Sequence, residues 1–237
     1  MPTEKSKLVY KIISWIVSLI VPVVVVLTAV RLVLAPWYVE FEYRTPNFPA
    51  DRYGFTRDER LRYSKIAIEY LLNDASISFL EEQRFPEGQQ VPEPSCQYMQ
   101  DCALMYNERE LQHMLDVKAV TQAALRVWLA SWLVLVVLGV WARLAGWWDE
   151  YRSGLSRGGW LTLILIGVLI AFVLVGFGIA FVVFHEIFFD PGTWRFLYSD
   201  TLIRLFPERF WRDTFLVVGL LAGTMAFCIG YFARIKR

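Results

Sequence analysis

The sequence predicts an all-α membrane protein with four transmembrane helices and a large, partly helical first outer loop. Hydrophobic residues make up 56% of the 237 residues and charged residues only 20%, whereas soluble domains are about 45–50% apolar. The apolar residues are concentrated in four long stretches separated by polar segments. Backbone groups in lipid can hydrogen-bond only to one another, so each stretch must be helical. We expect one integral membrane domain over residues 1–237.

Four stretches reach the length of about 20 apolar residues that a helix needs to cross the hydrocarbon core. They cover about 12–35, 120–141, 160–184 and 214–232. Three lysines precede the first stretch, as in a signal peptide, but its apolar run is too long for one. Pro36 would also follow its only plausible cleavage site. We therefore predict that the first stretch is retained as a transmembrane helix.

Lysine and arginine residues beside the spans predict which segments face the cytoplasm. The N-terminus, the connection between the second and third spans, and the C-terminus each carry several of them. These three segments are therefore predicted to be cytoplasmic, and segments 36–118 and 185–213 to face outward. The second outer segment also contains arginines, which weaken the bias without reversing it: Arg195, Arg204, Arg209 and Arg212.

The long outer segment carries signals for two helices. Thr56 followed by Glu59 has the spacing of a capping box, and the apolar pattern after it predicts a helix of about four turns. Prolines in residues 84–95 predict a stretch without regular structure. Asn107 followed by Glu110 repeats the cap spacing. A second helix is thus expected to begin in water and to continue unbroken into the second span.

Both histidines of the chain, His113 and His185, fall in the predicted outer segments. Glu110 and Asp116 lie three residues on either side of His113, and Glu186 adjoins His185. A carboxylate can fix the tautomer of an imidazole and raise its pKa, and imidazole exchanges protons near neutral pH. Either histidine alone fits an amphipathic side chain at the lipid–water interface. The pair, with its carboxylates, favours a catalytic site.

Two motifs stand out at the histidines: residues 110–118 (ELQHMLDVK) and residues 184–189 (FHEIFF), the latter followed by Trp194, Asp200, Thr201, Leu202, Phe206, Pro207, Phe210 and Trp211. These motifs and the four-span layout resemble those of the bacterial lipoprotein intramolecular transacylase family. The resemblance implies a multi-pass acyltransferase of the bacterial plasma membrane, with an outward-facing active site and a diacylated lipoprotein as substrate. Such an enzyme moves the sn-2 acyl chain of the diacylglyceryl group to the α-amine of the N-terminal cysteine.

This reaction asks little of the protein, because the substrate carries both the attacking amine and the ester. One imidazole would be the general base toward the amine, and the other, as imidazolium, would protonate the leaving glyceryl oxygen. His113 and His185 each fit either role, with Glu110, Asp116 and Glu186 in support. Candidates for binding the oxyanion or a lipid phosphate are Lys118, Arg126 and Arg204, although Arg126 also fits snorkelling toward the headgroups. No cofactor is expected.

Other classes of function are also compatible with parts of the sequence. A non-enzymatic four-span membrane partner or assembly protein would explain the outer loop without chemistry. No metal site is expected, since the sequence has neither an HExxH motif nor a third histidine. The net charge of +1 excludes the basic field of a nucleic-acid binder, so the expected partners are the lipoprotein and membrane lipids. Cys96 and Cys102 are expected to be bridged outside the cytoplasm, although both also fit free thiols.

Overall fold

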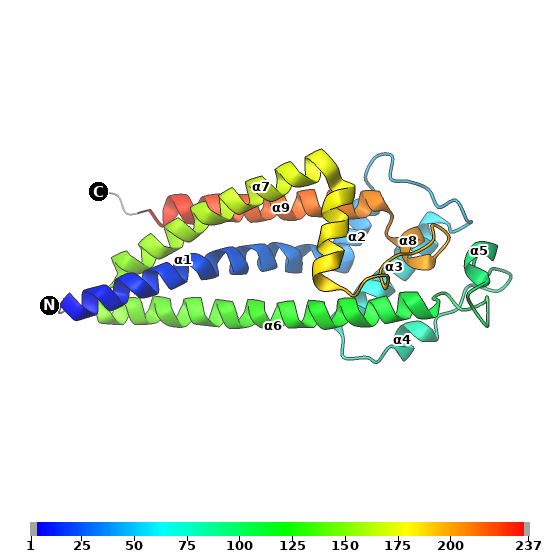
Figure 1. Ribbon diagram of the computed structural model, residues 1–237, viewed down its shortest axis with the longest axis horizontal. Coiled ribbons are helices and arrows are strands. Elements are labelled where there is room, and N and C mark those ends of the chain that lie inside the picture. Colours follow the sequence, from blue (N-terminus) through cyan, green and yellow to red (C-terminus); the bar gives the residue numbers. More distant parts are fainter. Residues whose placement is uncertain (1–3, 235–237) are drawn as a thin grey trace. The chain divides into compact units, whose positions relative to one another are not determined.

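The computed structural model describes residues 4–234, whose regular elements are helices (Figure 1). Four helices are long and apolar enough to cross a membrane: α1 (Glu4–Val33), α6 (Glu108–Ala145), α7 (Trp148–Phe188) and α9 (Glu208–Phe232). They correspond to the four predicted spans. α1 ends at Val33, slightly before the predicted end of the first span. The reason is Pro36, because a proline holds the residue before it extended, and Ala35 has φ −159° and ψ 151°.

Shorter helices occupy the polar segments between the long ones. They are α2 (Pro36–Tyr43), α3 (Arg57–Leu72), α4 (Ser78–Glu81), α5 (Glu93–Cys96) and α8 (Thr201–Leu205). The chain divides into two compact units. Unit 1 consists of the described residues of 1–32, 124–175 and 215–237, and unit 2 of residues 33–123 and 176–214. Both predicted outer segments, 36–118 and 185–213, therefore lie entirely in unit 2.

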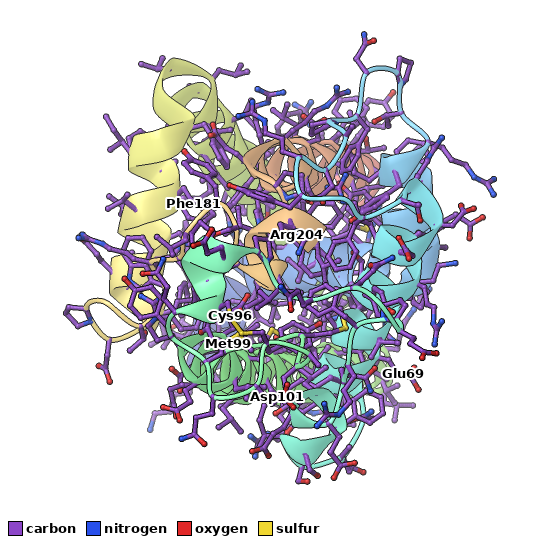
Figure 2. All side chains as sticks on the ribbon, turned by 90° about the vertical axis from the view of Figure 1, so that its right-hand side faces the viewer. Glu69, Cys96, Met99, Asp101, Phe181 and Arg204 are labelled. Carbon is purple, nitrogen blue, oxygen red and sulfur yellow. A yellow bond between two sulfur atoms is a disulfide. The ribbon has the colours of Figure 1, made fainter. Side chains whose placement is uncertain are left out.

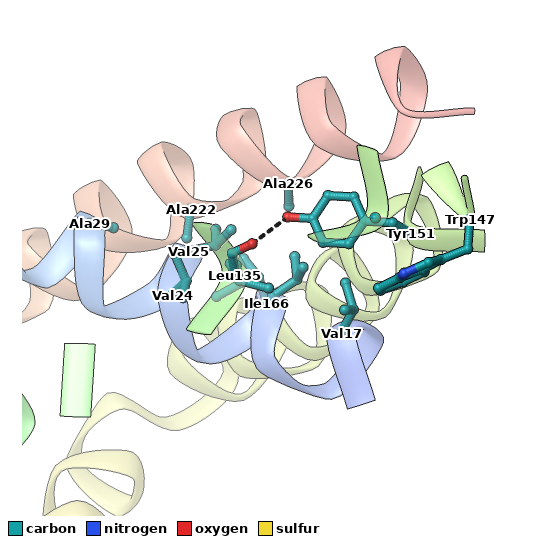
Figure 3. Close-up of a cluster of buried hydrophobic side chains, with 12 residues drawn as sticks. Val17, Val24, Val25, Ala29, Leu135, Trp147, Tyr151, Ile166, Ala222 and Ala226 are labelled. Carbon is teal, nitrogen blue, oxygen red and sulfur yellow. Dashed lines mark hydrogen bonds between the residues drawn. The ribbon is translucent and has the colours of Figure 1, made fainter. Parts of the chain in front are cut away.

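Unit 1 is a packed set of apolar helices. Its core brings together one buried face of α1 with side chains of α6, α7 and α9 (Figure 3). Tyr151 Oη donates a hydrogen bond of 2.9 Å to the Leu135 carbonyl within this core. α7 and α9 approach so closely that a Cβ on Gly159 would lie 2.5 Å from the backbone nitrogen of Gly230. Such proximity of small residues is how helices associate in lipid.

Local capping signals determine where the main helices of unit 2 begin. Thr56 and Glu59 form the predicted capping box, and α3 follows directly. The Asn107 backbone N–H donates to Glu110 Oε2 and the Glu110 N–H donates to Asn107 Oδ1, each at 3.0 Å. α6 begins at Glu108 and continues to Ala145. The prediction of a helix running from the polar segment into the second span is confirmed.

The proline-containing stretch 84–95 is more ordered than the sequence predicts. Arg84 pairs with Leu104 in an isolated antiparallel bridge, and α5 begins after Pro92. A proline near the first helical position is tolerated because the N–H it lacks would be unpaired there. The disulfide between Cys96 and Cys102, with a Cα–Cα distance of 5.3 Å, closes this region (Figure 2). The predicted bridge is thus confirmed.

Candidate active site

The fold places the two histidines beside each other in unit 2. His113 comes from the second turn of α6 and His185 from the last turn of α7. Their ring centroids are 6.1 Å apart, and the ring planes are inclined by only 22°. His113 is 8% exposed and His185 is 9% exposed. The structure thus brings together the two residues predicted to be catalytic.

Aromatic rings surround both imidazoles. The ring of His113 is 4.9 Å from that of Phe189 and 5.3 Å from that of Phe196. The ring of His185 lies 4.0 Å from Phe181, which is labelled in Figure 2, and 4.9 Å from Trp194. We call Phe181, Phe189, Trp194 and Phe196 the aromatic cluster. It gives the imidazoles an apolar surrounding.

A backbone carbonyl determines the tautomer of His185. Its Nδ1 lies 2.7 Å from the carbonyl oxygen of Phe181, one helical turn earlier in α7. A carbonyl oxygen can only accept, so Nδ1 carries a proton and donates it. In the neutral ring Nε2 then has a free lone pair. His185 can accept a proton at Nε2 without changing its existing hydrogen bond.

His113 has a different environment. Its Nδ1 is buried and has no hydrogen-bond partner within residues 4–234. His113 precedes the apolar part of α6, and burial together with the nearby His185 lowers its pKa to about 4. This shift favours the neutral imidazole. A neutral ring is a donor at one nitrogen and an acceptor at the other.

Glu110 is fully buried one turn before His113, but its carboxylate contacts backbone N–H groups. Oε2 accepts from Asn107 at 3.0 Å, and Oε1 accepts from Leu202 in α8 at 2.7 Å. Burial raises the pKa of Glu110 to about 8, against the effect of these two donors. Glu110 thus joins the first turn of α6, one turn before His113, to α8.

The other two carboxylates predicted to support the histidines lie at the surface. Asp116 accepts a hydrogen bond of 3.0 Å from Gln112 Nε2 on the same helix. Glu186 is exposed. Among the residues that the structure describes, neither carboxylate is hydrogen-bonded to an imidazole. The carbonyl of Phe181 has the orienting role that the sequence suggested for a carboxylate.

Lys118 anchors a loop of unit 2. Its Nζ donates to the Ala75 carbonyl at 2.6 Å and to Asn73 Oδ1 at 3.2 Å. The ammonium also lies 4.0 Å from the centroid of the Tyr70 ring. These contacts hold the chain after α3 against α6. The ammonium is thus bound by groups of the protein itself.

Arg204 is held in a buried ion pair within unit 2. Its Nη2 and Nε lie 3.0 and 3.1 Å from the two carboxylate oxygens of Asp51, and both side chains are 2% exposed. The guanidinium also stacks on the ring of Phe55 at 3.8 Å. Burial alone would raise the pKa of Asp51, but hydrogen bonds from Arg204 and nearby backbone groups keep it below its usual range. Arg126 is exposed and belongs to the part of α6 in unit 1.

A comparison with known protein families identifies the family of this chain. Residues 15–211 match the family described as lipoprotein intramolecular transacylase Lit. The chain belongs to this family. It is therefore an intramolecular transacylase, which is an acyltransferase, and a multi-pass integral membrane protein. Family membership also favours the enzymatic interpretation over the non-enzymatic membrane partner.

Similar proteins match this Lit-family member over most of its length. An uncharacterized protein of Aquifex aeolicus (strain VF5) is 29% identical over 215 residues, which is 90% of this chain and 88% of that protein. The in meso structure of the membrane integral lipoprotein intramolecular transacylase Lit from Bacillus cereus has a TM-score of 0.73 and 21% identity. The match covers 93% of this chain and 92% of the Bacillus cereus chain. A variant of that protein with one histidine replaced by arginine has a TM-score of 0.67 and 21% identity, with coverages of 95% and 91%. This likeness confirms the predicted fold class.

Sequence reasoning missed two buried carboxylates of this Lit-family member. One is Asp51, for which no local pattern predicts burial. The other is Glu42, which is 1% exposed and faces Asp213. Glu42 follows Tyr38 by four residues on the buried face of α2. A carboxylate at such an apolar-face position is a signal that a reading of helical periodicity can detect.

Proposed function

We propose that this Lit-family member moves the sn-2 acyl chain of a diacylglyceryl lipoprotein to the α-amine of the N-terminal cysteine, using His113 and His185. The observation that carries the proposal is the pairing of two buried imidazoles, with ring centroids 6.1 Å apart, in aromatic surroundings. Family membership supplies the class of reaction. The substrate contains both reacting groups, so the enzyme has to bring them together and transfer protons.

His185 is the general base in this proposal. Its Nδ1 proton is bound to the Phe181 carbonyl, so the Nε2 lone pair is available to take a proton from the attacking amine. The resulting imidazolium returns this proton to the glyceryl oxygen when the ester bond breaks. One residue thus acts first as base and then as acid.

His113 acts as a neutral hydrogen-bond donor. Burial and the nearby His185 lower the pKa of His113 to about 4, which supports a neutral His113 rather than the second, charged histidine expected from the sequence. A proton on Nδ1 would be buried without an acceptor, since this atom has no partner in the described chain. The proton therefore belongs on Nε2, where it can polarise the ester carbonyl. Neutral imidazole is an effective electrophile in this role.

The acyl transfer conserves every atom and proton of the substrate. The amine nitrogen attacks the ester carbon, a C–N bond forms, and the carbonyl electron pair moves onto oxygen. When the carbonyl re-forms, the C–O bond to glycerol breaks and the glyceryl oxygen receives the proton from His185. The products are an N-acyl cysteine and a free hydroxyl on the same lipoprotein. The aromatic cluster excludes water, which would otherwise hydrolyse the ester.

We also propose that the active site faces outward from the bacterial plasma membrane. Within unit 1, Tyr10 stacks on Trp147 with centroids 5.3 Å apart, and Arg152 Nη2 donates to the Arg234 carbonyl at 3.1 Å. The start of α1, the α6–α7 connection and the end of α9 therefore lie together, which supports a common cytoplasmic side for both termini. The Cys96–Cys102 disulfide supports an oxidising environment for segment 36–118, which belongs to the same compact unit as segment 185–213.

Mass spectrometry of lipoprotein N-termini tests the function directly. A bacterial host lacking this activity would receive the full chain or its His185→Ala variant. We expect N-acyl lyso-lipoprotein only with the full chain. If the parent chain leaves the lipoprotein diacylated on glycerol, although it is inserted and folded, the proposed reaction is wrong.

A further inference from the structure

Trp194 has a buried hydrogen-bond donor with no partner in the described structure. It lies in the loop between α7 and α8, and it is 8% exposed. Its indole Nε1 finds no acceptor within residues 4–234. Leaving a buried N–H unpaired costs about 1–3 kcal/mol, and native proteins rarely do so. The donor is therefore expected to find its acceptor in a bound molecule.

The unpaired indole lies beside the proposed base. Its ring centroid is 4.9 Å from that of His185, with planes inclined by 38°. His113 Nδ1 is another buried atom without a partner among the described residues, and it belongs to the same group of rings. With the His113 proton on Nε2, this Nδ1 is an acceptor, so the Trp194 N–H is the unpaired donor in the group of rings where we propose that the ester binds.

Other candidates for an oxyanion donor are bound to other groups of the protein, although Arg204 Nη1 has no partner among the described residues. Lys118 binds Asn73 and Ala75, and Arg204 binds Asp51. A cation close to the histidines would also disfavour protonation of the base. An indole N–H is a neutral donor that cannot act as an acceptor. In apolar surroundings such a fixed donor interacts strongly with developing negative charge.

We infer that the indole N–H of Trp194 donates a hydrogen bond to the ester carbonyl oxygen of the lipoprotein as that oxygen becomes negative. The inference rests on the proposed function of His113 and His185. While the C–N bond forms, the carbonyl pair moves onto oxygen and Trp194 Nε1–H stabilises it beside the His113 donor. Trp194 gives up no proton, so it is unchanged when the C–O bond breaks.

Kinetics of the full-length protein with a synthetic diacylglyceryl lipopeptide test this role. Trp194→Phe keeps an aromatic ring and removes the N–H. Removing one oxyanion donor lowers kcat about 10²–10³-fold, and we expect a loss of this size with KM within about twofold. The matched control is Trp211→Phe, an indole of unit 2 that packs on Phe206 and Phe210, which should keep the parent kcat.

A second variant separates the N–H from the shape of the ring. Incorporating benzothienylalanine at position 194 replaces the indole N–H by sulfur and preserves the two fused rings. We expect the same loss of kcat, without a change in the thermal unfolding midpoint. Parent-like kcat in this variant, while His185→Ala is inactive, would overturn the role of Trp194 and leave the proposed function intact. Full activity of His113→Ala and His185→Ala would instead reject the proposed function itself.

Discussion

The carboxylate of Glu110 accepts a hydrogen bond of 2.7 Å from the backbone N–H of Leu202, which lies 92 positions further along the chain. The same carboxylate caps its own helix through the N–H of Asn107. Glu110 therefore connects the start of α6 to the start of α8. His113 lies one turn further along α6, so its position depends on a contact with a distant part of the sequence.

We predict that Glu110→Ala strongly destabilises the protein. The substitution leaves two buried backbone N–H groups without acceptors, at a cost of about 1–3 kcal/mol each. Glu110→Gln keeps one acceptor oxygen and should lose less. The control is Asp116→Ala, which removes a surface carboxylate and should change the free energy of unfolding by less than about 0.5 kcal/mol. Thermal unfolding in detergent measures all three, and equal midpoints for the two alanine variants would contradict the assignment.

The second prediction concerns the histidines. His113→Ala and His185→Ala should each lower the rate of acyl transfer about 10²–10⁴-fold, the contribution typical of a group that moves a proton. The double variant should be little slower than the worse single one, because residues acting as a unit are not additive. Asp116→Asn should have a mild effect, since Asp116 contacts Gln112 at the surface. Formation of N-acylated product by each purified variant is the measurement, and additive losses would show that the two rings act independently.

Local signals made much of this structure predictable. Run lengths predict the four long helices, and the caps at Thr56 and Asn107 predict where α3 and α6 begin. The histidine pair follows from topology, because both residues fall in segments placed on the same side. These signals depend on residues that are close together in the sequence, so the sequence alone is enough to recognise them.

The partners of the buried charges were not predictable. Steps of three residues place Glu110 and Asp116 about 60° to either side of His113 on a helix. Each carboxylate therefore faces a different neighbour, and only tertiary packing decides which one. Arg204 and Asp51 are 153 positions apart, and no local pattern connects them. The sequence therefore suggested that Arg204 binds the oxyanion or a lipid phosphate, and it gave no sign of the pairing with Asp51.

The third prediction tests that ion pair. Asp51→Ala leaves the Arg204 guanidinium buried and unpaired, and breaking a buried pair in this way costs about 3–5 kcal/mol. The double variant Asp51→Ala with Arg204→Met should recover part of the loss, since no uncompensated charge remains. A double-mutant cycle from unfolding midpoints measures the coupling. If Asp51→Ala is as stable as the parent, the ion pair between Asp51 and Arg204 does not stabilise the fold.

The fourth prediction concerns pH. Burial and the nearby Asp213 raise the pKa of Glu42 from 4.5 to about 7. Between these values the folded state holds a proton that the unfolded state has lost, so stability falls as pH rises from about 4.5 to 7 and is level above. Glu42→Gln should remove this part of the slope and be more stable than the parent at pH 8. Unfolding midpoints across pH 4 to 8 provide the test, and identical profiles for the two proteins would refute it.

The fifth prediction concerns the disulfide. Cys96 and Cys102 are separated by 6 positions, and closing so short a loop stabilises a fold by about 2 kcal/mol in the chain-entropy description. Replacing both by serine should lower the unfolding midpoint and loosen the chain around α5. Cys228→Ser, which changes an exposed free cysteine, should have no effect. Addition of a reducing agent should lower the midpoint of the parent but not that of the double serine variant.

The carbonyl that orients His185 has a genetic consequence. In enzymes where a carboxylate holds a histidine, one codon change can abolish the orienting group. Here the acceptor is the main-chain oxygen of residue 181, which every amino acid provides. Substitutions at this position alter the aromatic contact but keep the acceptor. A saturation screen for inactive alleles should therefore recover changes at codons 113 and 185, with none that deletes the orienting acceptor, because it is encoded by the helix itself.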